Sequence, residues 1–303
     1  MTREANVIFL KKPTDVLSQL IKRFVQTTDL NRRTQLDQGH YWDEPLVGFA
    51  SGNDPLFAQF KSLIGSFHRT PREILEAALK EKGMGLLLSD MAQISVVSWV
   101  LPASEETRKS NRIEEKFPSK LWAYTRHYGE RCNNALKQHV VSFLEELGHV
   151  AVAPSLLPSC KALRDEKVGW ASPWSERHVA YACGLGTFSL NDGLITLKGM
   201  ALRIGSVVTL FKLTPSEKRY RQPKENCLHF RAGKCGKCIQ RCPVGAISEE
   251  KGHDKDKCRE YVYGEAVKKK QSEYGLDTPF SSCGLCQTGV PCEFEIPRPD
   301  LIA

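Results

Sequence analysis

The chain has 303 residues, 41% of them hydrophobic, and carries a formal net charge of +8, which together indicate a globular protein with a real core. No apolar run approaches the roughly 20 residues of a membrane span, and the first residues show neither a signal-peptide core nor a twin-arginine motif. We therefore expect a cytoplasmic protein with no membrane partner. Residues 1–220 carry most of the excess charge, with 29 basic against 23 acidic side chains.

Three helices are predicted in the first part of the chain. Apolar residues recur at helical spacing over 14–25, and a second helix is expected from Pro55 to about Phe67. The third has the clearest start, because Thr70–Glu73 (TPRE) combines a capping box with proline at the first helical position. Gly83 provides its stop.

The middle of the chain predicts alternating strands and helices. Residues 94–101 (ISVVSWVL) are β-branched and apolar, which indicates a buried strand. A helix is expected over 132–147, followed by a short strand at 150–152. This pattern predicts a mixed α/β layer.

A further helix is predicted over 173–183, with Ser172 as its N-cap and Gly184 as its stop, before strands at 194–197 and 202–211. The apolar pattern then fades over 212–224 (KLTPSEKRYRQPK), which we interpret as a solvated linker or a surface for an acidic partner. The predicted domains are therefore 1–220, an α/β cofactor and substrate domain, and 221–303.

Cysteine is the most informative residue type. Disulfides are not expected in a reducing cytosol, so eleven cysteines indicate metal ligation. Eight of them fall between residues 227 and 292, which marks a dedicated segment. Cys132, Cys160 and Cys183 lie outside it and are expected to be small buried apolar residues.

Residues 235–243 read CGKCIQRCP, the tail of the bacterial ferredoxin run C-x2-C-x2-C-x3-C-P. Ala232 stands where the first cysteine is expected, and Cys227 is the best replacement. The second half comprises Cys258 and residues 283–292 (CGLCQTGVPC). The sequence therefore predicts a ferredoxin-like domain with two 4Fe-4S clusters.

In this run the cysteine before proline crosses to the other cluster, which divides the eight thiolates into two sets. One set is Cys227, Cys235, Cys238 and Cys292, and the other is Cys242, Cys258, Cys283 and Cys286. A structural zinc site is the alternative, although Pro243 and the total of eight thiolates favour iron. His229 lies among the ligands and is expected to make a local hydrogen bond instead of binding metal.

The order of these motifs resembles cobalamin-dependent epoxyqueuosine reductases and their relatives the reductive dehalogenases. The resemblance covers roughly residues 90–292, and the motifs are SPWSERHVAYACGLGTF at 172–188, LRIGSVVTL at 202–210, CGKCIQRCPVGAI at 235–247, DKCREY at 256–261 and CGLCQ at 283–287. It implies a nitroreductase-like α/β domain that holds base-off cobalamin, followed by the two-cluster ferredoxin domain.

The cofactor would lie against Gly184, Leu185, Gly186 and Thr187, since the two glycines would bring bare backbone to the domain surface. Without the family context, a GLG motif after a helix is more often a structural stop. His178 is the one residue of this stretch that resembles a cobalt ligand. We expect its side chain to pack against the surroundings of its helix instead, which leaves the cobalamin base-off.

Three departures distinguish this chain from the family. Epoxyqueuosine reductases place an acid just before the SPxxER-like stretch, where this chain has Gly169–Ala171 (GWA). The helical repeats that read tRNA, and the export signal of the dehalogenases, are also not expected here. Nucleic acid is therefore not an expected partner.

The remaining candidate proton donor is Tyr181, with Arg177 as its electrostatic partner, and an ordinary structural role is the alternative for both. A second polar and aromatic group comprises Tyr124, His127 and Tyr128. Trp170 and Trp174 could stack on a macrocycle, although core packing or a domain seam is the ordinary role of such residues.

These features predict an iron-sulfur oxidoreductase that reduces a small-molecule substrate. We expect a ferredoxin or flavodoxin to supply the electrons, which the clusters pass to cobalamin. The alternative is an electron-transfer protein that reduces a corrinoid or flavin on a partner. A third hypothesis is a tRNA-modifying enzyme without the repeats, which steep salt dependence of binding would reveal.

Overall fold

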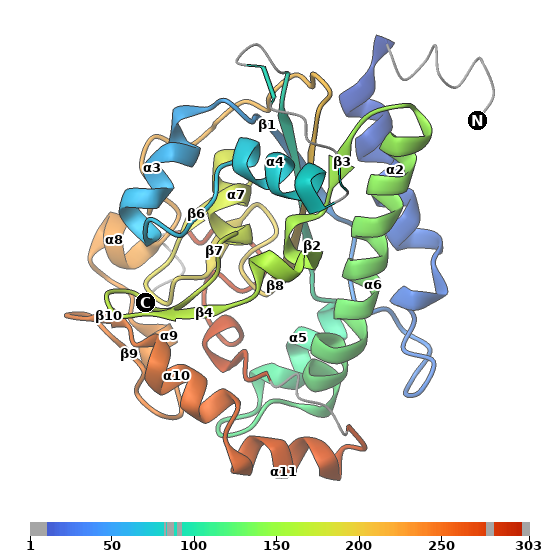
Figure 1. Cartoon of the computed structure of the whole chain (residues 1–303). Helices are drawn as coiled ribbons and strands as arrows, with labels where there is room; N and C mark the ends of the chain where they lie inside the picture. The colour runs from blue at the N-terminus through green and yellow to red at the C-terminus, as the bar shows by residue number, and fades with distance from the viewer. Residues whose placement is uncertain (1–10, 82, 84–87, 90–92, 277–281, 299–303) are drawn as a thin grey trace.

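The computed structural model describes residues 11–81, 83, 88–89, 93–276 and 282–298, so the predicted absence of a signal sequence lies outside the described residues. The fold is mixed α/β and is built on a four-stranded antiparallel sheet in the order β1-β2-β8-β3 (Figure 1). Its strands are β1 (Leu46–Ser51), β2 (Ser95–Pro102), β3 (Ala151–Val152) and β8 (Leu202–Thr209).

Strand β2 lies at the centre of the molecule, and all eight of its residues are buried. Val97 and Trp99 pack into one hydrophobic cluster, whereas Val96 and Val100 pack into another on the opposite face. The buried strand predicted at 94–101 is therefore confirmed. Its β-branched sequence suits a strand that is covered on both faces.

Helices cover both faces of the sheet (Figure 1). One face carries α2 (Pro13–Thr27) and α6 (Lys120–Glu146), with α5 (Glu105–Arg112) against α6. The other face carries α3 (Pro55–Ile64), α4 (Pro71–Glu81) and α7 (Glu176–Ala182). Among the described residues, no helix combines the length and apolar character needed to cross a membrane.

Some predicted helix boundaries are confirmed and others are wrong. Helix α4 has its capping box, because the Thr70 N–H donates to Glu73 Oε2 (2.8 Å) and the Glu73 N–H to Thr70 Oγ1 (3.3 Å). Helix α6 begins at Lys120, long before the predicted residue 132. Its N-cap is Ser119, whose hydroxyl accepts the Trp122 N–H. Its first turns contact the C-terminal segment, a tertiary effect that periodicity does not reveal.

Helix α7, in contrast, starts later than predicted, at Glu176 instead of residue 173. The Ser172 hydroxyl donates to the Trp174 carbonyl (2.6 Å) instead of capping a helix, and Ser175 occupies the N-cap position. Gly184 does end the helix, with φ of 74°.

The cysteine-rich part consists of short elements around their own small core. Its elements are α8 (Leu228–Ala232), α9 (Lys237–Gln240), β9 (Ile247–Ser248), β10 (Gly252–His253), α10 (Lys255–Val262) and α11 (Glu265–Glu273). Two hairpins face it, β4 (Leu163–Asp165) with β5 (Gly169–Ala171), and β6 (Gly186–Phe188) with β7 (Leu194–Thr196). Short 3-10 helices lie at Asp29–Asn31, Pro154–Leu156, Pro158–Cys160 and Leu285–Gln287.

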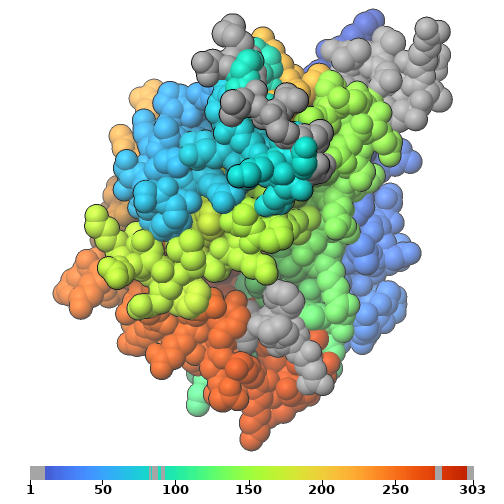
Figure 2. All heavy atoms as spheres, in the orientation of Figure 1, coloured from blue at the N-terminus to red at the C-terminus, as the bar shows by residue number. Residues whose placement is uncertain are grey.

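The packing crosses the predicted domain boundary at residue 220. Leu190, Ile195 and Met200, from the β6–β7 region, share a hydrophobic cluster with the cysteine-rich segment. In Figure 2 the β4–β5 region (yellow-green) lies directly against the C-terminal part (orange). The division into 1–220 and 221–303 stays a prediction.

The segment that carries Cys292 is attached to the turn before β8. The Met200 N–H donates to the Cys292 carbonyl (2.9 Å) and the Ala201 N–H to the Glu293 carbonyl (3.1 Å). Gly199 has φ of 73°, and a Cβ there would collide with the backbone of Glu293. The buried Glu293 carboxylate pairs with Arg112 of α5 (2.7 Å), which fixes the segment to the main fold.

Candidate redox site

Four thiols from separate parts of the cysteine-rich segment line one small cavity. They are Cys227, Cys235, Cys238 and Cys292. Much of the remaining lining is apolar and includes Leu190 and Met200. Burial and the neighbouring thiols raise the pKa of Cys238 to about 12, and the same causes raise the pKa of Cys292.

The other four thiols also interact with one another. Burial, with Cys258 and Cys242 nearby, raises the pKa of Cys283 to about 12. Burial and the thiols of Cys283, Cys258, Cys238 and Cys242 raise the pKa of Cys286. Because Cys238 belongs to the first set, the two sets are adjacent.

These thiols form a donor set that fits a polynuclear iron site. Buried thiolates repel one another, and bound metal cations reverse that penalty by deprotonating their ligands. Within the described part of the chain, no three His, Cys, Asp or Glu side chains are close enough to hold a single metal ion.

The other cysteines and His229 have the predicted local roles. Cys132, Cys160 and Cys183 are buried, and burial raises the pKa of Cys132 to about 12. These thiols are poor nucleophiles and poor ligands. His229 Nδ1 lies 3.0 Å from the Cys235 carbonyl oxygen, which is a hydrogen bond to backbone and not to sulfur.

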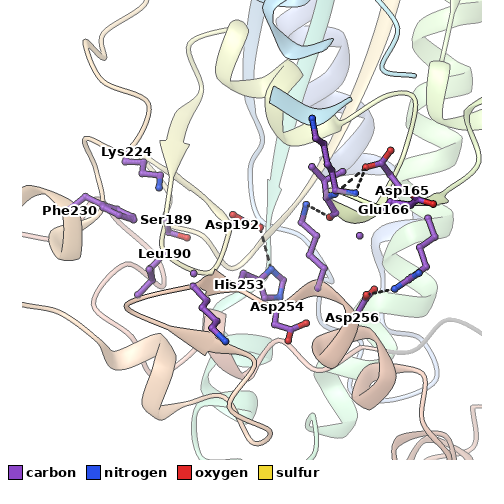
Figure 3. A pocket seen from close by; sticks show the side chains of 17 residues that line it. Asp165, Glu166, Ser189, Leu190, Asp192, Lys224, Phe230, His253, Asp254 and Asp256 are labelled. Carbon is purple, nitrogen blue, oxygen red and sulfur yellow. Dashed lines mark hydrogen bonds and ion pairs between the residues drawn. The ribbon is translucent and has the colours of Figure 1, made fainter. Parts of the chain in front are cut away.

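A second, larger cavity of about 480 Å³ lies between the β4–β5 hairpin, the loop after β6 and the segment 251–256 (Figure 3). Charged side chains of both signs line it. The basic ones are Arg164, Lys167, Lys224, Lys251 and Lys255, and the acidic ones are Asp165, Glu166, Asp192, Asp254 and Asp256. We call it the charged pocket.

The loop Ser189–Gly193 connects this pocket to both thiol sets. Leu190 lines the charged pocket and also the cavity of the first set. Asn191 Nδ2 donates to the carbonyl of Cys286, from the second set (2.9 Å). Asp192 Oδ2 lies 3.4 Å from His253 Nδ1 at the pocket (Figure 3). Sequence reasoning missed this loop, although Asn-Asp-Gly between two strands is a turn signal.

The wall of the charged pocket is attached to α10. Arg164 pairs with Asp256 (2.7 Å), and Lys255 Nζ donates to the Val168 carbonyl (3.3 Å). The acid expected by analogy at 169–171 is missing, as the sequence indicates. Asp165 lies at the pocket nearby, and its carboxylate accepts the N–H groups of the hairpin turn.

Of the predicted cofactor residues, Leu185, Gly186 and Thr187 are buried and Gly184 is half-buried, and their role toward a cofactor stays a prediction. A Cβ on Gly184 would lie 2.8 Å from the Glu217 carbonyl oxygen, and one on Gly186 would collide with the Ile195 carbonyl. Leu185 and Thr187 are buried, and Thr187 Oγ1 accepts the N–H of Asn226. The close approach that these glycines permit is used by the protein's own backbone.

The predicted proton donor Tyr181 does not line the charged pocket. Its ring packs near Phe188, with centroids 5.7 Å apart. The Arg177 guanidinium donates to the Asp192 carbonyl, so it supports the loop Ser189–Gly193. Burial lowers the pKa of Arg177, and the Asp192 carboxylate opposes this effect.

The other aromatic groups have structural roles. The Trp174 indole is buried and donates to Ser206 Oγ (2.9 Å), so it is a core residue. The Tyr124 hydroxyl donates to the Tyr274 carbonyl (2.9 Å), which attaches the end of α11 to α6. The rings of His127 and Tyr128 meet edge to face at 4.6 Å.

A buried ion cluster lies where α6 meets β8. Glu130 pairs with Arg126 (2.9 Å), with Lys137 (3.7 Å) and with Arg203. Burial alone would raise the pKa of Glu130, but these three cations lower it to about 2. Glu130 is therefore an anion enclosed by cations.

No family model matches this sequence, and no curated protein matches it. Among solved structures, the chain is similar to epoxyqueuosine reductase from Bacillus subtilis, with 15% identity, a TM-score of 0.46 and coverage of 94% of this chain and 71% of that one. For the enzyme from Streptococcus thermophilus the values are 14%, 0.47, 90% and 65%. An epoxyqueuosine reductase solved with a tRNA-Tyr stem loop gives 18%, 0.43, 94% and 71%.

Proposed function

We propose that this chain is an iron-sulfur oxidoreductase whose eight clustered cysteines hold two 4Fe-4S clusters. The observation that carries the proposal is the grouping of buried and half-buried thiols into two adjacent sets. The second set lies along the sequence between Cys238 and Cys292, which both belong to the first set. A late cysteine that returns to the first set is what the crossed ligation of two-cluster ferredoxins requires.

Such clusters supply electrons one at a time. The chain's own residues would insulate and connect them. Leu190 and Met200 restrict water near the first set, whereas the loop Ser189–Gly193 lies between the clusters and the charged pocket. We propose that a small polar acceptor is reduced in that pocket, and that a ferredoxin or flavodoxin supplies the electrons.

The proposal does not include cobalamin, which the sequence resemblance implies. A corrinoid with its nucleotide tail is larger than a drug-sized ligand, whereas the charged pocket has a volume of about 480 Å³, within the drug-sized range. Its lining is charged where a macrocycle needs apolar faces, and Leu185, Gly186 and Thr187 are buried. The residues around the two cavities therefore do not fit the group.

This disagreement favours the second candidate function, in which the clusters reduce a corrinoid or flavin on another protein. The missing acid at Gly169–Ala171 also favours it. The two functions differ in the acceptor: a small molecule that binds the isolated chain supports the first, and reduction only of a partner-bound cofactor supports the second. Binding to tRNA is not part of either proposal.

Iron and sulfide analysis of anaerobically purified protein tests the proposal. We expect eight of each per chain, and about four of each would overturn the assignment of two clusters. Cys227→Ser should degrade the EPR signal of one cluster, since Cys227 replaces the ligand missing at Ala232. Cys160→Ser is the matched control, because Cys160 is buried and belongs to neither set. Two normal signals in Cys227→Ser would refute the role of Cys227.

A further inference from the structure

Positive charge is divided unevenly between the two parts of the chain that hold the thiol sets. Residues 221–241, which carry three thiols of the first set, have six basic side chains and one acidic one. Residues 242–276, which carry two thiols of the second set, have seven of each. Two bound clusters of the same kind would add the same charge to each set, so the difference would remain. The first set is therefore the one with an excess of positive charge along its chain.

Three of these cations form an exposed surface, which we call the basic face. Arg231 lies in the last turn of α8, Lys234 in the following loop and Lys237 at the start of α9, and all three are exposed. Within the described part of the chain none of them forms an ion pair: Arg231 donates to a backbone carbonyl (2.8 Å) and Lys237 to an amide oxygen (3.3 Å). The one acid of residues 221–241, Glu225, accepts two backbone N–H groups (2.7 and 3.1 Å). The three cations are therefore available to a partner.

The loop of the basic face leaves a thiol of the first set close to the surface. Cys235 lies in this loop and is half-buried, as is Cys238. Gly233 has φ of 62° and ends α8, and no other group lies within 4 Å of the position that a Cβ would take there. Glu249 is the acid beside this loop, with Oε1 3.7 Å from the corresponding position at Gly236, so it reduces the positive charge without cancelling it. A partner can therefore approach the loop closely.

We propose that the basic face is the docking site of an acidic electron-carrier protein, of the ferredoxin or flavodoxin kind, which reduces the first cluster. This inference rests on the proposed two-cluster function, to which it adds the place where the electron donor binds. The carrier loses one electron and the oxidised cluster gains it, with no covalent bond formed or broken. Complementary charge speeds such encounters, and redox encounters bury less than about 1,200 Å², an area that three cations around one loop can serve.

The position and size of the basic face favour a protein over a nucleic acid. Binding to RNA strengthens with the number of phosphates that are neutralised, and three cations neutralise few. The face also surrounds the half-buried Cys235, and a redox partner has to come close to a cluster, whereas a nucleic acid gains nothing from this position. Binding of RNA is therefore an outcome that the test must separate from docking of the carrier.

Stopped-flow oxidation of a reduced, acidic flavodoxin by the reconstituted full-length protein tests the basic face. We expect Lys234→Glu/Lys237→Glu to slow this reaction roughly tenfold or more at low salt, and the wild-type rate to fall as salt is added. Lys268→Glu/Lys269→Glu is the matched control, because it makes the same change in net charge at exposed side chains of α11, and it should leave the rate nearly unchanged. Reduced methyl viologen, a small cation, should reduce the test variant at least as fast as the wild type.

The outcomes separate this inference from the proposed function. Wild-type protein without two cluster signals in EPR would contradict the two-cluster function itself. With both clusters present, an equal flavodoxin rate in Lys234→Glu/Lys237→Glu and the wild type would overturn the docking site alone. Reduction of the wild type by methyl viologen but not by flavodoxin would also overturn it. Equal slowing in both double variants would do the same, because it would show an effect of net charge and not of one face.

Two further results complete the test. If Lys234→Glu/Lys237→Glu loses iron, Lys234→Gln/Lys237→Gln decides, because it removes the charges and keeps long polar side chains: an unchanged flavodoxin rate there refutes the inference. A variant that loses binding to RNA and keeps the wild-type flavodoxin rate would assign the face to nucleic acid, which refutes the inference as well.

Discussion

The guanidinium carbon of Arg259 lies 3.6 Å from the centroid of the Trp170 ring, so α10 is stacked on the β4–β5 hairpin. Because such a contact contributes about 0.5–2 kcal/mol, Trp170→Ala should loosen the hairpin from α10 while the central sheet stays intact. Hydrogen exchange should become faster at residues 163–171 and stay unchanged in β2. Trp170→Phe keeps an aromatic face and should show a smaller effect. Equal exchange in Trp170→Ala and the wild type would mean that the stack does not hold the hairpin.

The ion cluster around Glu130 predicts a large effect on stability. Glu130→Gln leaves three buried or half-buried cations without their anion, so we expect a loss of about 3–5 kcal/mol in the free energy of unfolding, measured by urea denaturation near pH 7. The pKa of Glu130 is depressed, so its stabilisation is fully present above pH 4.5 and is lost as the pH falls towards 2. Glu105→Gln, at an exposed pair, is the control and should change stability little. A loss below 1 kcal/mol for Glu130→Gln would contradict the prediction.

His178 predicts a pH dependence of folding. Burial, with Arg177 nearby, lowers its pKa to about 3 from the ordinary 6.5, so the unfolded chain binds a proton that the folded protein excludes. Stability should fall by roughly 1.4 kcal/mol per pH unit from this residue as the pH drops below 6.5. His178→Gln removes that contribution, so its unfolding free energy should change less between pH 7 and pH 5 than that of the wild type. The same pH dependence in both proteins would show that His178 is not excluded from protonation.

The crossed ligation predicts that substitutions of Cys292 and of Cys242 damage different clusters. Cys292→Ala should degrade the cluster of Cys227, Cys235 and Cys238, whereas Cys242→Ala should degrade the other. Low-temperature EPR of the reduced proteins distinguishes them, because each variant should keep the signal that the other loses. Loss of the same signal in both variants would show that the ligands are divided differently.

Titration with cobalamin tests whether this chain binds the corrinoid, which the sequence resemblance implies and the lining of the two cavities does not fit. Because neither cavity fits a macrocycle, we expect no binding at micromolar protein, measured by the visible spectrum and by EPR of the cob(II)alamin state. A base-off signal that forms at stoichiometric cobalamin would contradict this expectation and restore the function that the sequence resemblance implies. Free flavin, a smaller planar ligand, provides a comparison under the same conditions.

Local signals in the sequence predicted local structure well. The capping box at Thr70 and Glu73, the strand at 94–101 and the glycine stop at Gly184 all depend on neighbouring residues, and the structure has them. The early start of α6 follows a local N-cap at Ser119 that the apolar periodicity did not reveal. Trp174, which was predicted to lie in α7, instead precedes that helix and makes a tertiary hydrogen bond to Ser206 that periodicity cannot detect.

In the candidate site too, features set by neighbouring residues could be predicted, whereas features set by tertiary contacts could not. The spacing of the cysteines identifies the eight candidate ligands, since each is visible in the sequence, and their division into two sets stays a prediction. The relation of Asp192 to His253 joins residues 61 positions apart along the numbering, and no motif links them. Likewise, Gly184 and Gly186 suggested an open surface because sequence shows where a Cβ is absent, but not which backbone fills the space.

The attachment of Cys292 through Met200 and Glu293 has a consequence for biosynthesis. Under the proposed ligand sets, the first cluster needs Cys292 and the second needs Cys283 and Cys286, all of which are translated after the four strands of the central sheet. Neither cluster can then be completed on a nascent chain that is still short of these residues. Completion of the first cluster is therefore coupled to the pairing of residues 292 and 293 with the turn at 200 and 201, because one segment carries both Cys292 and these contacts.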